Sequence, residues 1–300
     1  MKKHALALAA ITAFFSVSQA QENTALDQLI GTSDINIAVP EAPLPDRGPI
    51  LDSIYNTWDP AAPFSYSQAP ALVLSNTGGV TVIKNVRSGA APADHKSYAW
   101  DTLTIKTALI EKVIFGYRTY GVGHSFLVFV FRDGGAVNSL GKSVRALTFG
   151  AEGWSREPYG YTLAHALNGR YPLLWLATTF ESYTGYIVAK KTDSFFKNMN
   201  LGPAQTARLF GLLIARIDET NRNKETYNMF TNSCTNNPVN LINQVIPADK
   251  RIALEVIGVT NPNSALPRLA VRKYTNNGTL RTETFRMGAD NYSQFDITRI

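Results

Sequence analysis

The chain has one cysteine, Cys234, and it follows an N-terminal export signal. A single cysteine cannot close an intrachain disulfide, so the fold must be held by its apolar core. Proteins exported to an oxidising compartment usually pair their cysteines or lack them. Polar residues flank this unpaired thiol in residues 227–235. The context therefore favours a chemical role, and Cys234 is the first candidate nucleophile.

Residues 1–20 have the parts of a cleavable signal peptide. Lys2 and Lys3 supply positive charge, residues 5–15 form a short apolar core, and small residues precede a cleavage site after Ala20. We expect cleavage there and a periplasmic mature protein. Because the apolar run is too short for a membrane anchor, we expect no transmembrane segment in the mature chain.

About 280 residues remain after cleavage, enough for one large domain or two small ones. The formal net charge is +6, and the Lys and Arg residues are scattered. This pattern predicts no nucleic-acid partner, while the mild basic excess is compatible with peripheral contact at an anionic membrane surface. One cysteine and dispersed histidines give no paired ligand spacing, so we expect no metal and no other cofactor.

Proline content divides the mature chain. Residues 21–70 are rich in Pro, Asp and Ser and predict an extended arm, with residues 50–55 as one helical turn. We expect a Cys/His acyl-chemistry domain over residues 71–250. Residues 251–300 are predicted to form a C-terminal β-rich extension packed on that domain.

Strand patterns dominate the first half of the domain. Two glycines at 78 and 79 favour a tight hairpin between the first two strands. The unbroken apolar run 126–131 is typical of a strand buried on both faces. The predicted strands are 71–75, 80–86, 100–107, 112–118, 126–131 and 143–149, followed by a hairpin of 171–179 with 184–190.

Helical spacing appears in the C-terminal half. Pro203 opens an amphipathic helix, and a second helix is predicted to start near Cys234. The unpaired amides of that second helix would favour a thiolate and offer donors to an oxyanion. We therefore predict an α+β fold with a mostly antiparallel central sheet and the nucleophile at a helix N-terminus.

A cysteine nucleophile needs a base, and the mature chain has three histidines. His124 follows two glycines and stands at the mouth of the buried strand, where a rigid core can aim its imidazole. His95 lies in a polar loop, and His165 lies in a segment that predicts a surface helix or loop. His124 is therefore the candidate base.

Three separated motifs carry a resemblance to a known family. They are residues 80–87, then Gly123-His124-Ser125-Phe126 leading to Phe131-Arg132-Asp133-Gly134, and finally Tyr227-Asn228 with Asn232-Ser233-Cys234-Thr235. From about Val80 to Ile246 the chain resembles the periplasmic N-terminal domain of Lnb-type lipoprotein N-acyltransferases. The resemblance implies a permuted papain-like fold, with Cys234 as acyl-accepting nucleophile and His124 as its base.

The sequence departs from the family pattern at two points. Lnb-type enzymes continue into membrane-spanning helices, whereas the stretch after Ile246 is polar here. The family has an acidic residue where this chain has Arg145. Either Glu152, a backbone carbonyl or an amide side chain then orients His124. Further orienting or oxyanion candidates are Asn232, Ser125, Thr235 and Tyr227.

We hypothesise a thiol-dependent acyltransferase or hydrolase that acts on an ester or amide of the cell envelope through a Cys234 thioester. The substrate would be a lipid, a lipoprotein or a peptidoglycan-derived molecule. Two alternatives stay open, a non-catalytic envelope ligand-binding module on the same scaffold and a cell-wall peptidase or amidase. Structural roles also stay open for Cys234 and His124 as core residues, and for Tyr227 and Asn232.

Overall fold

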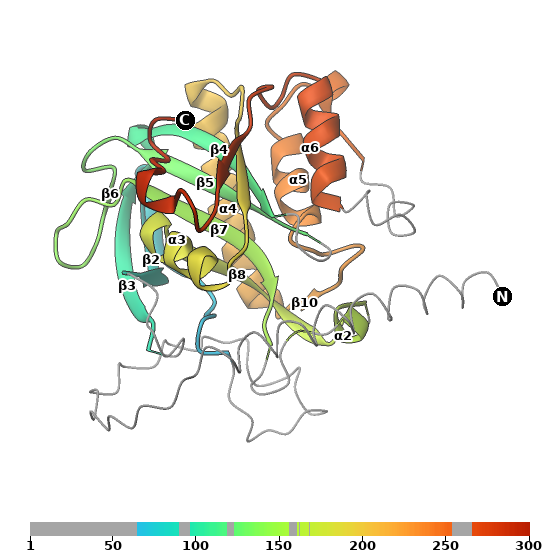
Figure 1. Cartoon of the computed structure of the whole chain (residues 1–300). Helices are drawn as coiled ribbons and strands as arrows, with labels where there is room; N and C mark the ends of the chain where they lie inside the picture. The colour runs from blue at the N-terminus through green and yellow to red at the C-terminus, as the bar shows by residue number, and fades with distance from the viewer. Residues whose placement is uncertain are drawn as a thin grey trace. The chain divides into compact units, whose positions relative to one another are not determined.

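One large sheet organises the part of the chain that the structure describes (Figure 1). Its strands are β1 Leu72–Thr77, β2 Val80–Ser88, β3 Ala99–Lys106, β4 Ile110–Arg118, β5 His124–Phe131, β6 Ala136–Val137, β7 Ala146–Gly153, β8 Tyr171–Thr179, β9 Ser194–Asn198, β10 Thr226–Tyr227 and β11 Phe285–Met287. The strand order is β11-β9-β4-β5-β7-β8-β2-β3-β6, with β1 paired to β2 and β10 to β8. Among the described strands, β2 and β8 pair parallel and the other named pairs are antiparallel.

The computed structural model describes residues 65–89, 97–118, 123–155, 161, 163–167, 169–253 and 266–300. These residues all belong to one unit, Pro43–Ile300. The signal peptide, most of the predicted arm with its helical turn at 50–55, and His95 lie outside the described residues. Within the ranges given, no helix has the length and apolar character needed to cross a membrane.

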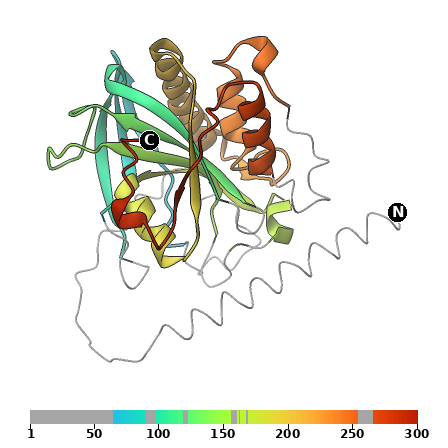
Figure 2. The same ribbon diagram turned by 45° about the horizontal axis from the view of Figure 1, so that its top comes forward.

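Helices cover both faces of the sheet (Figures 1 and 2). The helical segments are η2 Thr107–Leu109, α2 Leu163–Leu167, α3 Phe180–Ala189, α4 Pro203–Asn223, α5 Asn236–Asn243, η3 Ala248–Lys250, α6 Leu266–Asn276 and η6 Tyr292–Gln294. One core lies between the sheet and α4, α5 and α6, while a smaller core lies between the other face and α3. Helix α6 lies beside α5, where the Tyr274 hydroxyl donates to Val239 O at 3.2 Å.

Strand β5 joins the two cores because its side chains alternate between them. Phe129 packs toward α4, with ring centroids 5.2 Å from Phe210. Phe126 faces the opposite way and packs 4.7 Å from Tyr183 of α3. Both faces of β5 are buried, so every position of the strand after His124 is apolar or small. The prediction of a doubly buried strand is confirmed.

The α+β class and the mostly antiparallel sheet are confirmed, as are the first six predicted strands, the strand at 171–179 and the helix at Pro203. The prediction of a strand at 184–190 is wrong, because this stretch lies in α3. Thr179 caps that helix by accepting a hydrogen bond from Ser182 N at 3.2 Å. Tyr183 and Ile187, one turn apart, then pack on the sheet.

Residues 251–300 also differ from the expected β-rich stretch. They contain α6 and a single short strand, β11, among the residues described there. Helix α6 places Ala270, Val271 and Tyr274 in the larger core at helical spacing. The polar residues between them hid this period from the sequence reading.

A substitution at Gly116, which contacts Phe126, tests the packing behind the start of β5. These residues are opposite each other in the β4–β5 pair, and a Cβ on Gly116 would overlap the Phe126 ring. We expect Gly116→Ala to lower the free energy of unfolding by about 1–3 kcal/mol through overpacking. Urea unfolding of the mature chain measures this change.

Gly211→Ala is the matched control. Gly211 lies inside α4 and has no neighbouring atom within 4 Å of a built Cβ. The alanine should therefore raise stability by about 0.5–1 kcal/mol. Equal unfolding midpoints for Gly116→Ala and the unmodified protein would contradict the packing described here.

Candidate active site

His124 begins β5 and points to the face of the sheet that α3 covers. Its ring stacks on Phe126 with centroids 6.0 Å apart. Gly123 precedes it with a φ of 78°, and a Cβ there would lie 3.0 Å from Arg118 O. Glycine is thus required at the turn into β5. Gly150 on β7 leaves room for the imidazole, because a Cβ there would lie 3.2 Å from His124 Nε2.

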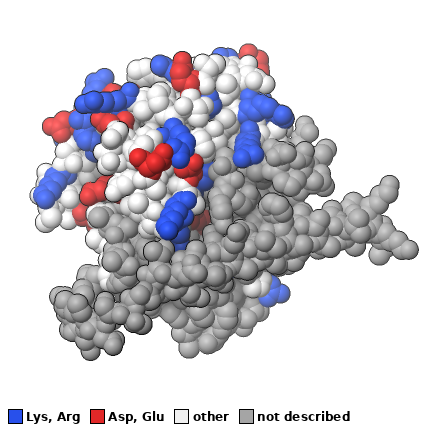
Figure 3. All heavy atoms as spheres, viewed as in Figure 1, with Lys and Arg blue, Asp and Glu red and all other residues white. Residues whose placement is uncertain are grey.

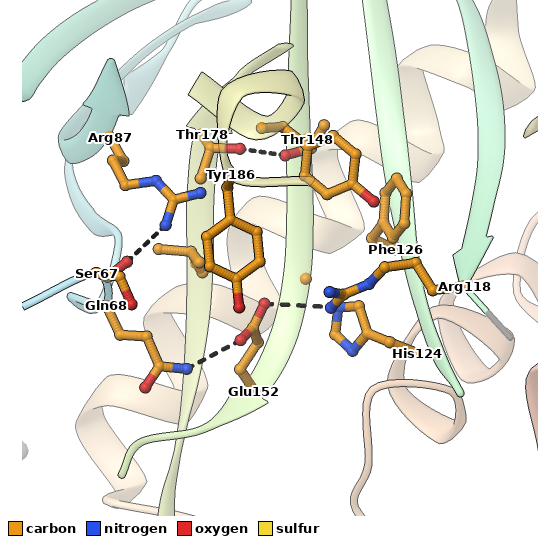
Figure 4. A pocket seen from close by; sticks show the side chains of 13 residues that line it. Ser67, Gln68, Arg87, Arg118, His124, Phe126, Thr148, Glu152, Thr178 and Tyr186 are labelled. Atoms are coloured by element: carbon orange, nitrogen blue, oxygen red, sulfur yellow. Dashed lines mark hydrogen bonds and ion pairs between the residues drawn. The ribbon is translucent and has the colours of Figure 1, made fainter. Parts of the chain in front are cut away.

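Glu152 on β7 is the carboxylate nearest to that imidazole. Its Oε1 lies 3.5 Å from His124 Nε2, as Figure 4 shows. Its Oε2 accepts a hydrogen bond from Gln68 Nε2 at 2.9 Å. The carboxylate is held between the two side chains, which suits a group that fixes the orientation of an imidazole. Gln68 comes from the end of the predicted arm.

Burial lowers the pKa of His124 well below its ordinary value of 6.5, and the positive charge of Arg118 lowers it further. The side chain is 16% exposed. At neutral pH the imidazole is therefore uncharged. An uncharged imidazole has a free lone pair and is able to accept a proton from a nucleophile.

Cys234 lies in the loop between β10 and α5, two residues before the helix begins. It is 7% exposed. The Tyr227 hydroxyl donates to its Sγ at 3.7 Å, and Thr235 Oγ1 lies 3.9 Å from the same sulfur. A hydrogen bond from the backbone of Ser125 also reaches the thiol. The sulfur is thus surrounded by polar donors inside the protein.

Ser125 ties the start of β5 to this loop. Its Oγ donates to Cys234 O at 3.0 Å and lies 2.9 Å from Thr235 Oγ1. Ser125 is fully buried. Because Ser125 is the next residue after His124, the strand that carries the histidine is bonded directly to the loop that carries the cysteine.

Burial raises the pKa of the Cys234 thiol, and hydrogen bonds from Ser125, Tyr227 and Thr235 offset part of that rise. We expected helix amides to favour a thiolate. The burial effect outweighs them, so the resting sulfur is a thiol. At pH 7 the thiol and the imidazole are thus both neutral, and the described contacts join Cys234 to Ser125, Tyr227 and Thr235 rather than to His124.

The amides before and in the first turn of α5 already have acceptors. Ser233 Oγ accepts from the amides of Thr235 and Asn236, each at 3.2 Å. Ser233 O accepts from the amide of Asn237 at 3.1 Å. We expected these amides to face an oxyanion. Ser233 accepts from them instead, so these three amides are not free to face an oxyanion.

Asn232 holds the loop in place from its other side. Its Nδ2 donates to Glu225 Oε2 at 2.9 Å, and its Oδ1 accepts from Asn237 Nδ2 at 2.9 Å. Glu225 also accepts from Arg216 of α4 at 2.6 Å. The side chain of Asn232 is thus fully engaged in binding the cysteine loop to α4 and α5.

A small cavity lies beside His124 (Figure 4). It has a volume of about 40 Å³ and is lined by Gln68, Arg87, Arg118, His124, Glu152 and Tyr186, among others. Sequence reasoning missed Gln68 and the two arginines. No clear signal in the sequence marked the arginines, because β2 and β4, in which Arg87 and Arg118 lie, also contain other charged residues.

Two other residues considered above lie in different surroundings. His165 is on α2, where its ring packs 5.9 Å from Tyr171. Arg145, which replaces the family's acidic residue, donates to Phe131 O at 2.9 Å.

On the outer surface, charges of both signs are interspersed over the described part of the face shown in Figure 3.

The comparisons with known proteins give one match. The model of one family, described as Lnb N-terminal periplasmic domain, matches residues 99–263. This range covers more than half of the chain and includes His124, Glu152 and Cys234. Comparison with curated proteins and with solved structures finds no match.

The lowered pKa of His124 predicts a pH-dependent stability. Below about pH 6.5 the unfolded chain binds a proton at this histidine and the folded chain does not, so stability falls as the pH falls. For one proton the slope is at most about 1.4 kcal/mol per pH unit. Urea unfolding at about pH 7.5 and about pH 5.5 measures it.

His124→Gln should remove this part of the pH dependence, because glutamine does not titrate. The loss of stability between the two pH values should then be smaller in the variant than in the unmodified protein. Identical losses in the two proteins would show that the imidazole is protonated normally in the folded state.

Proposed function

The chain belongs to the family of Lnb N-terminal periplasmic domains, and from this premise we propose a periplasmic enzyme that acts on an ester or amide of the cell envelope through a thioester on Cys234. The fold we propose for this chemistry is permuted papain-like. In that arrangement the histidine, on β5, precedes the cysteine in the chain, and the cysteine lies just ahead of α5.

The bond between the Ser125 hydroxyl and the Cys234 carbonyl is the observation that supports the proposal best. It fixes the cysteine loop against β5 at the residue after His124, and because adjacent residues of a strand face opposite sides, it positions the backbone of His124 rather than its ring. The packing of Phe126 and the carboxylate of Glu152 hold the imidazole from two further sides. Catalytic groups held by buried neighbours are pre-organised for reaction.

The first half-reaction forms the thioester. The Cys234 sulfur attacks the carbonyl carbon of the substrate while its proton passes to the imidazole of His124. The tetrahedral intermediate then expels the alcohol or amine, which takes the proton from the imidazolium. Glu152 stabilises the transient positive charge and keeps the ring oriented.

The second half-reaction returns the enzyme to its starting state. An amine, a hydroxyl or water attacks the thioester carbonyl and gives its proton to His124. The proton then returns to the departing sulfur as the thiol is restored. Transfer and hydrolysis differ only in the acceptor at this step.

Tyr227 is the donor that we assign to the oxyanion. Tyr227 is 4% exposed, and its hydroxyl lies 3.7 Å from the sulfur. A donor this close to the sulfur is within reach of an oxygen on the carbon that the sulfur attacks. Burial holds the pKa of Tyr227 well above 10, so the hydroxyl keeps its proton.

One observation favours a second candidate, a ligand-binding module without turnover. Cys234 is 7% exposed, and its thiol is not activated in the resting state. A protein that had kept the scaffold but lost turnover would have such a site. A cell-wall peptidase or amidase would use the same chemistry on another substrate. Its reaction would differ from acyl transfer in the product that is released.

Covalent acylation tests the enzyme proposal. We expect the mature protein, incubated with a p-nitrophenyl acyl ester, to gain one acyl group on Cys234 by mass spectrometry, and Cys234→Ser to gain none. Loss of the general base in His124→Gln should slow acylation by about 10²–10⁴-fold.

His165→Gln is the matched control, because this histidine lies on α2 in different surroundings, and acylation should be unchanged. Absence of any adduct at mildly alkaline pH, or equal acylation rates with and without His124, would contradict the proposal. Ligand binding that survives in Cys234→Ser without an adduct in the unmodified protein would support the binding module instead.

A further inference from the structure

Two arginines line the cavity beside His124 without a carboxylate partner among the described residues. Arg87 is 2% exposed, and among the described residues it donates to neutral oxygens, Ser182 Oγ at 3.1 Å and Ser67 O at 2.8 Å. Arg118 has a buried Nε with no hydrogen-bond partner in the described part of the chain. Both cations thus retain unused binding capacity.

The two guanidinium groups approach the same place. Their Cζ atoms lie 5.2 and 6.0 Å from the ring centre of Tyr186. Figure 4 shows Arg118 entering the cavity beside His124 and Arg87 entering from the opposite side. Burial lowers the pKa of Arg87, and the nearby charge of Arg118 adds to that effect. Two like charges are therefore held together in a poorly solvated space.

Glu152 is the one carboxylate among the described residues that line this space. Its oxygens contact Gln68 and His124, and it forms no ion pair with either arginine, although its charge attracts both. With a neutral His124, the cavity keeps an excess of one positive charge. A buried charge is costly unless an opposite charge pairs with it. The cavity therefore suits an anionic ligand.

We propose that this cavity binds a carboxylate group of the substrate, with Arg118 as its main contact and Arg87 as the second cation. The inference rests on the proposed function and names the substrate class for the same site. An arginine fork matches a carboxylate through two parallel hydrogen bonds. The hydroxyls of Thr148 and Thr178 line the same cavity and supply further polar contacts.

The small size of the cavity favours a carboxylate over the bulkier phosphate. Its volume is about 40 Å³. A carboxylate has three non-hydrogen atoms, whereas a phosphate has five and would need the cavity to widen. Cys234 does not line the cavity, but Arg118 is close enough to interact with the charge of its thiolate, so the substrate would reach from Arg118 to the sulfur.

Anion binding to Cys234→Ser tests the cavity without catalysis. Acetate should raise the melting temperature of this protein above that in chloride of equal ionic strength. Arg118→Gln in the same background should lose the rise, and Arg222→Gln should keep it, because Arg222 is exposed and pairs with Asp218 on α4. Stabilisation by inorganic phosphate but not by acetate would overturn the carboxylate assignment, and stabilisation by neither would overturn the anion site.

Two alkylating probes then connect the cavity to the thiol. Iodoacetate and iodoacetamide differ in the carboxylate, so the ratio of their rates at Cys234 reports a cation near the sulfur. We expect Arg118→Gln to lower the iodoacetate to iodoacetamide ratio by about tenfold or more. Arg118→Lys keeps the positive charge but loses the paired donors of the guanidinium, and it should give an intermediate ratio. This variant serves as the test if Arg118→Gln does not fold.

An unchanged ratio in both variants would overturn the proposal. The two probes also separate this inference from the function that it rests on. Lack of reaction with the neutral iodoacetamide counts against Cys234 as a nucleophile, while acetate binding by Cys234→Ser is still a test of the cavity.

Discussion

The contact of Ser125 with the cysteine loop is the constraint on which the site depends. Ser125 is buried at the start of β5, and its hydroxyl and backbone bond to Cys234 and Thr235. β5 is fixed in turn because both of its faces are packed, one toward α4 and the other toward α3. The position of His124 relative to the cysteine loop is therefore set by the core itself, and a change in either core would move the site.

Burial decides the protonation of Cys234 and His124 more than the position of Cys234 before α5 does. It raises the pKa of Cys234 and lowers that of His124, so both groups are neutral at rest. Arg118 adds to the second effect and is also a candidate ligand for a substrate carboxylate. An anion in the cavity would weaken the effect of Arg118 on the imidazole and make it a stronger base. Substrate binding and base strength are coupled in this account.

Hydrophobic patterns and short motifs in the sequence predicted those elements whose structure depends on nearby residues. The alternation and apolar runs predicted β1 to β5, β7 and β8 but not the two-residue β6, and Pro203 with its apolar period predicted α4. The motifs around His124 and Cys234 predicted both candidate residues. The sequence missed α3 and α6, since β-branched and polar residues obscured their helical period. It also missed Gln68, Arg87 and Arg118, which come from β2, β4 and the end of the arm and meet beside His124 only in the folded chain.

The pH dependence of Cys234 alkylation by iodoacetamide tests most directly whether imidazole and thiol act together. If His124 draws the proton from the sulfur, the unmodified protein reacts faster than His124→Gln at neutral pH, and the two rates converge at alkaline pH, where the thiolate forms without a base. Superimposable rate profiles for the two proteins from neutral to alkaline pH would contradict the account.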